Sequence, residues 1–212
     1  MSRLTDVIKN LIIINVIVYI AIKTIPETFK VYTDLGPMFF FLSDNFKPFQ
    51  IVTSMFMHAN VIHLLMNMMG LYFLGPTVER VLGSKRFLIL YILAGLGGSL
   101  LHQITQYIEY SGLTCTNCIE MQYIMGIPVL GASGAIYGVV IAFMTMFPNE
   151  KLMIIPIPIP IKAAYLGMAM VAAALYFGIS DNEPGGYAHF AHLGGALAGF
   201  ILIHFWKMAK LR

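Results

Sequence analysis

Residues 128–147 read PVLGASGAIYGVVIAFMTMF and contain no charged side chain. A transmembrane helix needs about 20 consecutive, mostly apolar residues, and this stretch has that length. The whole chain has the same character, because 58% of its 212 residues are hydrophobic and only 11% are charged, against about a quarter charged in soluble domains. The sequence therefore predicts an integral membrane protein and excludes a disordered chain or a disulfide-rich secreted domain.

Five further apolar stretches surround this one, at about 10–25, 59–75, 87–107, 162–179 and 188–206. No cleavage-site pattern of small residues follows the first of them, so we interpret it as a retained helix and not as a signal peptide. Six spans leave no room for a separate soluble domain in a chain of this length. We predict an all-α membrane protein, a bundle of six transmembrane helices that forms one domain over residues 1–212.

The basic residues are distributed unevenly between the two sides that six spans define. Ten of the 13 Lys and Arg residues fall in the terminal segments and the alternate connections: Arg3, Lys9, Arg80, Lys85, Arg86, Lys151, Lys162, Lys207, Lys210 and Arg212. By the positive-inside rule both termini are expected in the cytoplasm. The net charge of +3 includes no basic stretch suited to nucleic acid. Without a transit peptide, we expect a multi-pass protein of the bacterial cytoplasmic (inner) membrane.

Three connections between the spans have unusual sequences. Residues 26–50 include Met38-Phe39-Phe40-Phe41, which is too apolar for a solvated loop and is expected in the outer membrane interface. Residues 155–161 alternate Ile and Pro and are expected to form an extended cytoplasmic linker, because each Pro lacks an N–H donor. Cys115 and Cys118 form a C-x-x-C outside the membrane. In an oxidising compartment these two cysteines could form a small disulfide. Two thiols without a paired His do not make a zinc site, so we expect no metal.

Polar side chains inside spans are the candidates for function, because each is unfavourable in lipid without a partner or a water-filled cavity. His63 and Asn67 share one face of the second span, Ser133 and Tyr137 share one face of the fourth, and His192 lies near the start of the sixth. Singly, each has a structural interpretation, such as a Ser bonded to its own helix or a His–Asn contact between helices. Together they lie at similar depth in the outer half of the bundle.

Small residues predict which helices touch. Gly134 and Gly138 form a small-xxx-small pair on the fourth span, and Gly195 and Gly199 form another on the sixth. Helices that carry such pairs can approach closely. We therefore expect the Ser133 oxygen and a His192 nitrogen to come within about 3 Å of each other.

A Ser and a His at this distance are the parts of a nucleophile and its base. His192 would take the Ser133 proton, since imidazole titrates near neutral pH. No Asp or Glu occurs at this depth, so a two-residue unit is predicted, with the Tyr137 ring packed on His192. His63, Asn67 and the Ser133 backbone N–H are the candidate donors to an oxyanion. Water must enter from outside through a polar cavity.

These residues resemble the rhomboid family of intramembrane serine proteases. The similarity runs from Phe49 to Gly199 and rests on five motifs: Met57-His58, His63-x-x-x-Asn67, Glu79-Arg80 with Gly83, Gly131-x-Ser133-Gly134-x-x-Tyr137, and Ala191-His192-x-x-Gly195-x-x-x-Gly199. The resemblance implies the minimal six-helix form without a cofactor. It implies Ser133 as nucleophile, His192 as base, and His63 and Asn67 as oxyanion donors.

The resemblance also implies what the protein acts on. Its substrates would be single-pass transmembrane proteins, cut near the outer ends of their helices. They would enter from the lipid bilayer beside the second and fifth spans, and residues 180–188 would cap the site. One departure is that Phe49-Gln50 replaces a Trp-Arg pair common in the family, so the first loop must be anchored differently.

Three other functions were compared with this one. A catalytically silent relative would bind transmembrane helices without cutting them. Such a protein is expected to lack Ser133 or His192, and both residues are present here. A channel or transporter would show mid-membrane charges and an internal repeat, and neither occurs. An α/β-hydrolase would need Gly where Ala135 stands.

Overall fold

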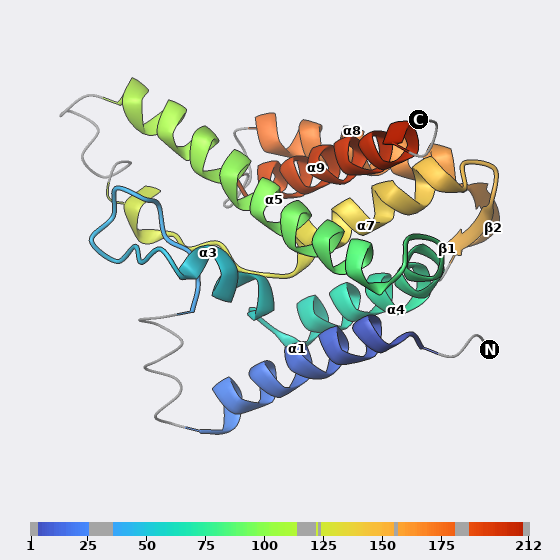
Figure 1. Cartoon of the computed structure of the whole chain (residues 1–212). Coiled ribbons are helices and arrows are strands. Elements are labelled where there is room, and N and C mark those ends of the chain that lie inside the picture. The colour runs from blue at the N-terminus through green and yellow to red at the C-terminus, as the bar shows by residue number, and fades with distance from the viewer. Residues whose placement is uncertain are drawn as a thin grey trace.

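Helices form at each of the apolar stretches in the computed structural model (Figure 1), which describes residues 4–25, 36–113, 122, 124–154, 157–180 and 187–209. The long elements are α1 (Asp6–Thr24), α4 (Val61–Leu82), α5 (Ser84–Gly112), α7 (Ser133–Met146), α8 (Ala163–Ile179) and α9 (Tyr187–Ala209). Short elements complete the chain: α3 (Gln50–Thr53), the 3-10 helix η1 (Ser54–Phe56), and strands β1 (Lys151–Ile154) and β2 (Ile157–Lys162).

Four of these helices, namely α1, α4, α5 and residues 188–207 of α9, are long and apolar enough to cross a membrane. The other two, α7 and α8, are apolar but shorter, with 14 and 17 residues. The chain is therefore an all-α membrane protein with four long and two shorter apolar helices. Its one described sheet is the β1–β2 hairpin.

Several predicted span boundaries were wrong by four residues or more, and two of them bear on the site. The second helix continues beyond residue 75 to Leu82, with Pro76 inside it, and ends at Gly83, whose φ is +79°. The fourth helix begins at Ser133 and not at 128, because Val129 pairs with Met38 in an isolated antiparallel bridge. Gly131, with φ +127°, separates this extended segment from the helix.

The helix α7 is at the centre of the bundle and packs against α4, α5, α8 and α9. Its contact with α9 depends on glycines, as predicted: the position of a Gly195 Cβ is filled by the Gly134 carbonyl, and that of a Gly199 Cβ lies 2.5 Å from the Gly138 carbonyl oxygen. The sequence analysis did not anticipate that α5 joins this packing. A Cβ on Gly98 would lie 2.6 Å from the Ala191 carbonyl oxygen. Three backbones therefore meet where the candidate residues lie.

The Ile-Pro alternation is extended, as predicted, in the part that the structure describes, but it is not a free linker. Strand β2 pairs with β1 in antiparallel register, with Lys162 opposite Lys151 and Ile161 opposite Leu152. Proline suits strand positions whose N–H side faces away from the partner. The period of two in the sequence keeps the prolines on that side and leaves the Ile N–H groups to pair.

The first loop is held by two glutamines. The Gln50 carboxamide accepts from the Lys47 N–H at 3.0 Å and donates to the Asn45 carbonyl at 3.0 Å. Gln103 on α5 accepts from the Phe41 N–H at 2.9 Å and donates to the Phe39 carbonyl at 2.8 Å. The residue that replaces the family's Arg therefore anchors the loop by amide hydrogen bonds.

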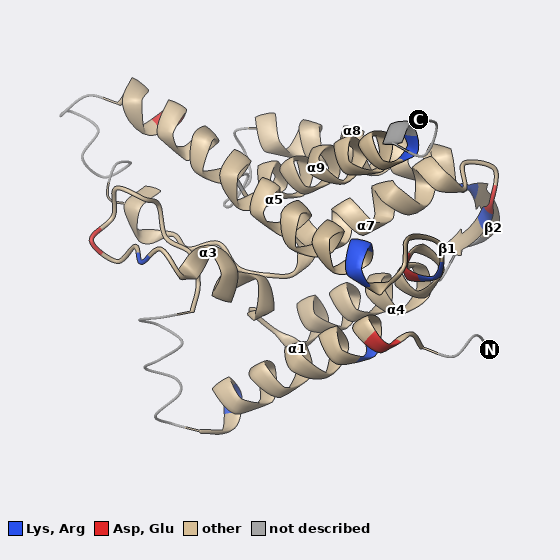
Figure 2. Ribbon diagram, in the orientation of Figure 1, with Lys and Arg blue, Asp and Glu red and all other residues tan. Residues whose placement is uncertain are grey.

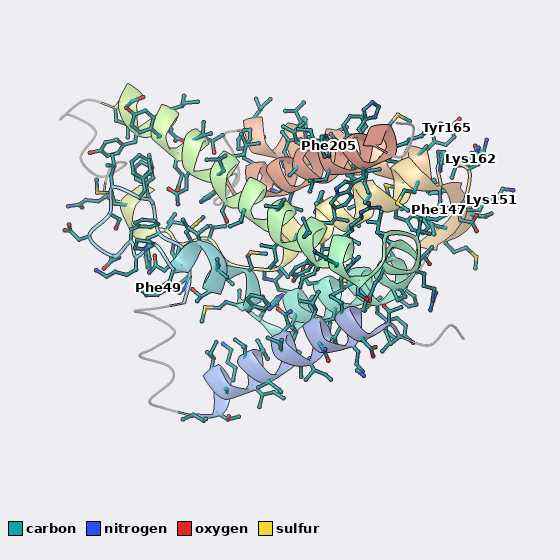
Figure 3. The ribbon with its side chains drawn as sticks, in the orientation of Figure 1. Phe49, Phe147, Lys151, Lys162, Tyr165 and Phe205 are labelled. Atoms are coloured by element: carbon teal, nitrogen blue, oxygen red, sulfur yellow. The ribbon has the colours of Figure 1, made fainter. Side chains whose placement is uncertain are left out.

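The two ends of the bundle differ in composition. Figure 2 shows Lys and Arg mainly at one end, where α1 begins, α5 begins and α9 ends. Phe147, Lys151, Lys162 and Tyr165 lie at this end, and Phe49 lies at the other (Figure 3). The same-end placement of the first and last helix termini matches an even number of crossings. The C-x-x-C cysteines and residues 181–186 of the cap expected at 180–188 lie outside the described residues.

Candidate active site

The candidate nucleophile Ser133 is the first residue of α7 and is half-buried. Gly131 sets the turn before it, because its φ of +127° is a conformation that L side chains rarely adopt. The Gly131 N–H donates to the Ser54 carbonyl at 2.8 Å, which fixes the turn to the η1 helix. The first N–H groups of a helix have no partner within it, so the backbone N–H at Ser133 is a potential donor to a ligand.

His192 lies in the second turn of α9 and contacts Ser133 directly. Its Nε2 is 2.8 Å from the Ser133 Oγ, and its ring is stacked on Tyr137, with centroids 4.4 Å apart and an interplanar angle of 1°. The Nδ1 atom is buried and has no hydrogen-bond partner in the described part of the chain. The imidazole is therefore positioned by ring stacking, and the described residues place no carboxylate against it.

His63 lies across the turn from Ser133. The Asn60 side chain caps α4 by accepting from the His63 N–H at 2.8 Å, which fixes the first turn of this helix. A Cβ added to Gly131 would lie 2.9 Å from the His63 Nε2 and 3.7 Å from the Ser133 Oγ. Gly131 therefore leaves the space in which the imidazole and the hydroxyl approach each other. Buried His58 packs edge-on against His63, with ring centroids 5.1 Å apart.

Asn67, which was predicted as an oxyanion donor, bonds within its own helix in this structure. Its side chain is buried, and its Nδ2 donates to the His63 carbonyl oxygen of its own helix at 2.9 Å. This is the ordinary i to i−4 bond of a polar side chain inside a helix. In this conformation Asn67 supports the His63 backbone, whereas the His63 ring contacts the turn at Gly131.

A cavity of about 160 Å³ lies over these residues. Its lining includes Ser54, His63, Ser99, Ser133, Ala188 and His192. The volume accommodates a few water molecules, since each water occupies about 30 Å³ in the liquid, and the lining offers polar partners for them.

A rhomboid domain matches residues 45–208, which is most of the chain. The chain belongs to the rhomboid family. Rhomboid protein 1, mitochondrial, of Saccharomyces cerevisiae is 34% identical over 165 residues, which cover 76% of this chain and 42% of the yeast protein. Rhomboid protease AarA of Providencia stuartii is 30% identical over 155 residues, 70% of this chain and 52% of that protein.

The match covers only part of each of these relatives. RHOMBOID-like protein 12, mitochondrial, of Arabidopsis thaliana is 28% identical over 199 residues, 92% of this chain but only 57% of the plant protein. The chain thus spans about half the length of these curated relatives. The similarity covers the domain that holds Ser133 and His192.

The sequence did not predict the roles of Ser54 and Ser99, which line the cavity of this rhomboid. It also did not predict the packing of the α5 glycines. Ser54 belongs to a short 3-10 helix that no periodicity announces. Ser99 follows Gly95-Leu96-Gly97-Gly98, and this glycine-rich stretch on α5 was a usable signal for a third close-packed helix. In the described parts of the chain, no group of three or more His, Cys, Asp or Glu side chains is placed to hold a metal ion.

Proposed function

We propose that this rhomboid is an intramembrane serine endopeptidase that cleaves transmembrane protein substrates near the outer face of the membrane. The observation that carries the proposal is the 2.8 Å contact between the Ser133 Oγ and the His192 Nε2 inside a polar-lined cavity. A His within hydrogen-bond reach of a Ser is the arrangement that makes a hydroxyl nucleophilic. The name of the Providencia relative, a rhomboid protease, supports the same activity.

In the proposed acylation step, the Ser133 Oγ attacks the carbonyl carbon of the scissile peptide bond. His192 Nε2 takes the hydroxyl proton, and the carbonyl oxygen becomes an oxyanion. The Ser133 backbone N–H and the His63 ring are the donors on that side of the nucleophile, and donors positioned in advance stabilise the developing charge. His192 then gives its proton to the leaving amine, which departs and leaves an acyl-enzyme on Ser133.

Deacylation repeats this chemistry with water as the nucleophile. A water molecule in the cavity loses a proton to His192 and attacks the ester carbonyl carbon. The proton returns to the Ser133 Oγ as the ester bond breaks, so the enzyme is regenerated. Tyr137 keeps the imidazole plane fixed through both steps, because its ring is parallel to that of His192.

The proposal includes a topology. Six membrane crossings with both termini in the cytoplasm would place the first residues of α4, α7 and α9 toward the outer face. The excess of Lys and Arg at the opposite end of the bundle supports this orientation (Figure 2). We further propose the bacterial cytoplasmic membrane as the location and single-pass membrane proteins as the substrates, entering from the bilayer.

The test is cleavage of a reporter transmembrane substrate by purified protein in liposomes. We expect Ser133→Ala to abolish cleavage without changing expression or thermal unfolding in detergent. The matched control is Ser111→Ala, since the Ser111 hydroxyl is exposed on α5 and donates to the Ile108 carbonyl of its own helix. Equal cleavage by Ser133→Ala would remove the proposed nucleophile. No cleavage by the wild-type protein of any rhomboid-type reporter would favour a catalytically silent helix-binding protein.

A further inference from the structure

A second cavity, of about 270 Å³, lies at the Lys- and Arg-rich end of the bundle, away from Ser133. The ends of four helices form it, and its lining includes Leu82, Arg86, Thr145, Phe147, Trp206 and Lys207. Its position is therefore that of a membrane interface, where the lipid headgroups meet the helix ends.

The cavity carries positive charge and no negative charge in its lining. The Arg86 guanidinium lies 6.0 Å from the centroid of the Trp206 ring, on which it is held by a cation–π contact. Within the residues that the structure describes, neither Arg86 nor Lys207 forms an ion pair, and the ion pair that is seen joins Lys9 to Asp6 elsewhere on the surface. Two cations therefore line this cavity, and the described residues place no acidic side chain in its lining.

An apolar groove shares one lining residue, Thr145, with this cavity. It has a volume of about 800 Å³ and lies between α7, α8 and α9, with Met168, Leu197 and Phe200 among its lining residues. Among the described residues that line the groove, Thr145 is the only one with a polar side chain. Its hydroxyl donates to the Ile141 carbonyl at 2.7 Å, so the groove presents an apolar surface throughout.

We propose that this cavity and groove bind one anionic phospholipid. The phosphate lies between Arg86 and Lys207, Trp206 packs on the glycerol region, and an acyl chain follows the groove along α7 and α9. The charge favours an anionic lipid over a zwitterionic one, because each Lys or Arg near the surface favours an anionic lipid by roughly fivefold. The groove favours a lipid over free phosphate, since only a lipid has a chain to bury there.

Trp206 is the only tryptophan of the chain and lies in the cavity, so its fluorescence reports on the site alone. The protein is reconstituted in phosphatidylcholine vesicles, and phosphatidylglycerol or phosphatidylcholine brominated near the upper end of the acyl chains is titrated in. We expect brominated phosphatidylglycerol to quench Trp206 at roughly 25-fold lower mole fraction than brominated phosphatidylcholine, since two cations each contribute a preference of roughly fivefold.

Charge variants and competition by inorganic phosphate test the two parts of this proposal. Arg86→Gln with Lys207→Gln should abolish this roughly 25-fold preference, because the two charges are its source. The matched control, Lys151→Gln with Lys162→Gln, removes two exposed charges of the β1–β2 hairpin and should leave the preference unchanged. Equal quenching by both lipids in the wild type, or a preference that survives in the Arg86 and Lys207 variant, would overturn the proposal. So would release of the quencher by millimolar inorganic phosphate, which would mark the site as one for free phosphate.

Discussion

Gly131 lies where the turn before α7, the Ser133 hydroxyl and the His63 ring meet. Its φ of +127° lies outside the range of most L side chains, and the space of its missing Cβ is taken by the His63 ring. A side chain there would meet both a backbone penalty and a clash. The glycine in this motif is thus required by geometry on two independent counts.

Gly131→Ala should therefore impair both stability and catalysis. The backbone strain alone costs about 1–3 kcal/mol, and a displaced His63 or Ser133 should lower kcat by at least roughly tenfold, because catalysis tolerates little misplacement. Thermal unfolding in detergent and reporter cleavage measure the two effects. Gly126→Ala is the control, since nothing lies within 4 Å of a Cβ at that exposed helical position. Equal loss in both variants would contradict the geometric argument.

His63 and Asn67 should differ in their contributions to catalysis. The His63 ring contacts the turn beside Ser133, whereas the Asn67 amide is bonded to its own helix. Loss of an oxyanion donor lowers kcat by about 10²–10³, and we expect this of His63→Ala, with KM little changed. Asn67→Ala should cost less than roughly tenfold. An Asn67 effect as large as that of His63, in steady-state kinetics in liposomes, would mean that Asn67 turns toward the oxyanion.

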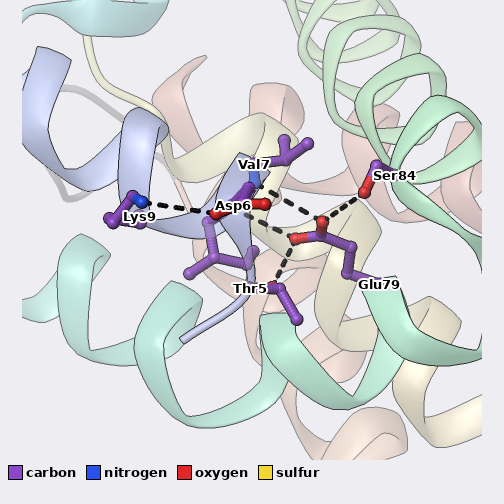
Figure 4. A network of polar contacts seen from close by, with 7 residues as sticks. Thr5, Asp6, Val7, Lys9, Glu79 and Ser84 are labelled. Carbon is purple, nitrogen blue, oxygen red and sulfur yellow. Dashed lines mark hydrogen bonds and ion pairs between the residues drawn. The ribbon is translucent and has the colours of Figure 1, made fainter. Parts of the chain in front are cut away.

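At the scale of elements, a buried carboxylate joins three helices at the basic end of the bundle (Figure 4). Glu79 of α4 accepts hydrogen bonds from the Thr5 hydroxyl and from the Val7 and Ile8 N–H groups, which are the first donors of α1. It also accepts from the Ser84 hydroxyl at the start of α5, at 2.7 Å. An acidic side chain at two helix N-termini is favourable because the helix dipoles point their positive ends toward it.

Glu79→Gln should destabilise the bundle at this junction. The amide keeps one acceptor oxygen and turns two donors toward groups that are themselves donors, which costs about 1–3 kcal/mol for buried unsatisfied groups. Thermal unfolding in detergent should show the loss. Asp6→Asn is the control, because the Asp6–Lys9 pair is exposed at the surface and such pairs contribute about 0–1 kcal/mol. A Glu79 variant no less stable than the Asp6 variant would contradict this role.

Helices and strands were predictable from the sequence where they depend on local properties, and not where they depend on a distant partner. Apolar length and small-residue spacing are local properties, so the helices and the Gly134–Gly195 approach were predicted correctly. The start of α7 at Ser133 was not, since it depends on a bridge between Val129 and the distant Met38. The β1–β2 pairing was missed for the same reason: alternation with Pro predicts an extended chain but not its partner.

The site was predictable to a similar degree. Ser133 and His192 were expected within about 3 Å, and the glycines that allow this distance are readable in the sequence. The Asn67 orientation was not, because an amide chooses among several acceptors according to the packed structure. The contribution of Gln50 and Gln103 to the first loop was also beyond the sequence, since their partners are backbone groups of that loop.

For the molecule as a whole, the two ends of the bundle hold different groups. One end of the bundle holds a half-buried hydroxyl, an imidazole and a cavity for water, and the other holds the basic residues and the Glu79 junction. The close-packed glycines of α5, α7 and α9 connect the two. Glycines let these helix backbones pack directly against one another. The position of the cavity beside Ser133 therefore depends on backbone contacts and not on flexible side chains.

The most direct measurement is covalent labelling of the purified wild-type protein with a fluorophosphonate probe, followed by mass spectrometry of the modified peptide. Our account predicts one adduct per chain, on Ser133, formed at a rate that falls by about 10²–10⁴ in His192→Ala. An adduct on any other serine, or labelling of Ser133 at an undiminished rate without His192, would contradict it.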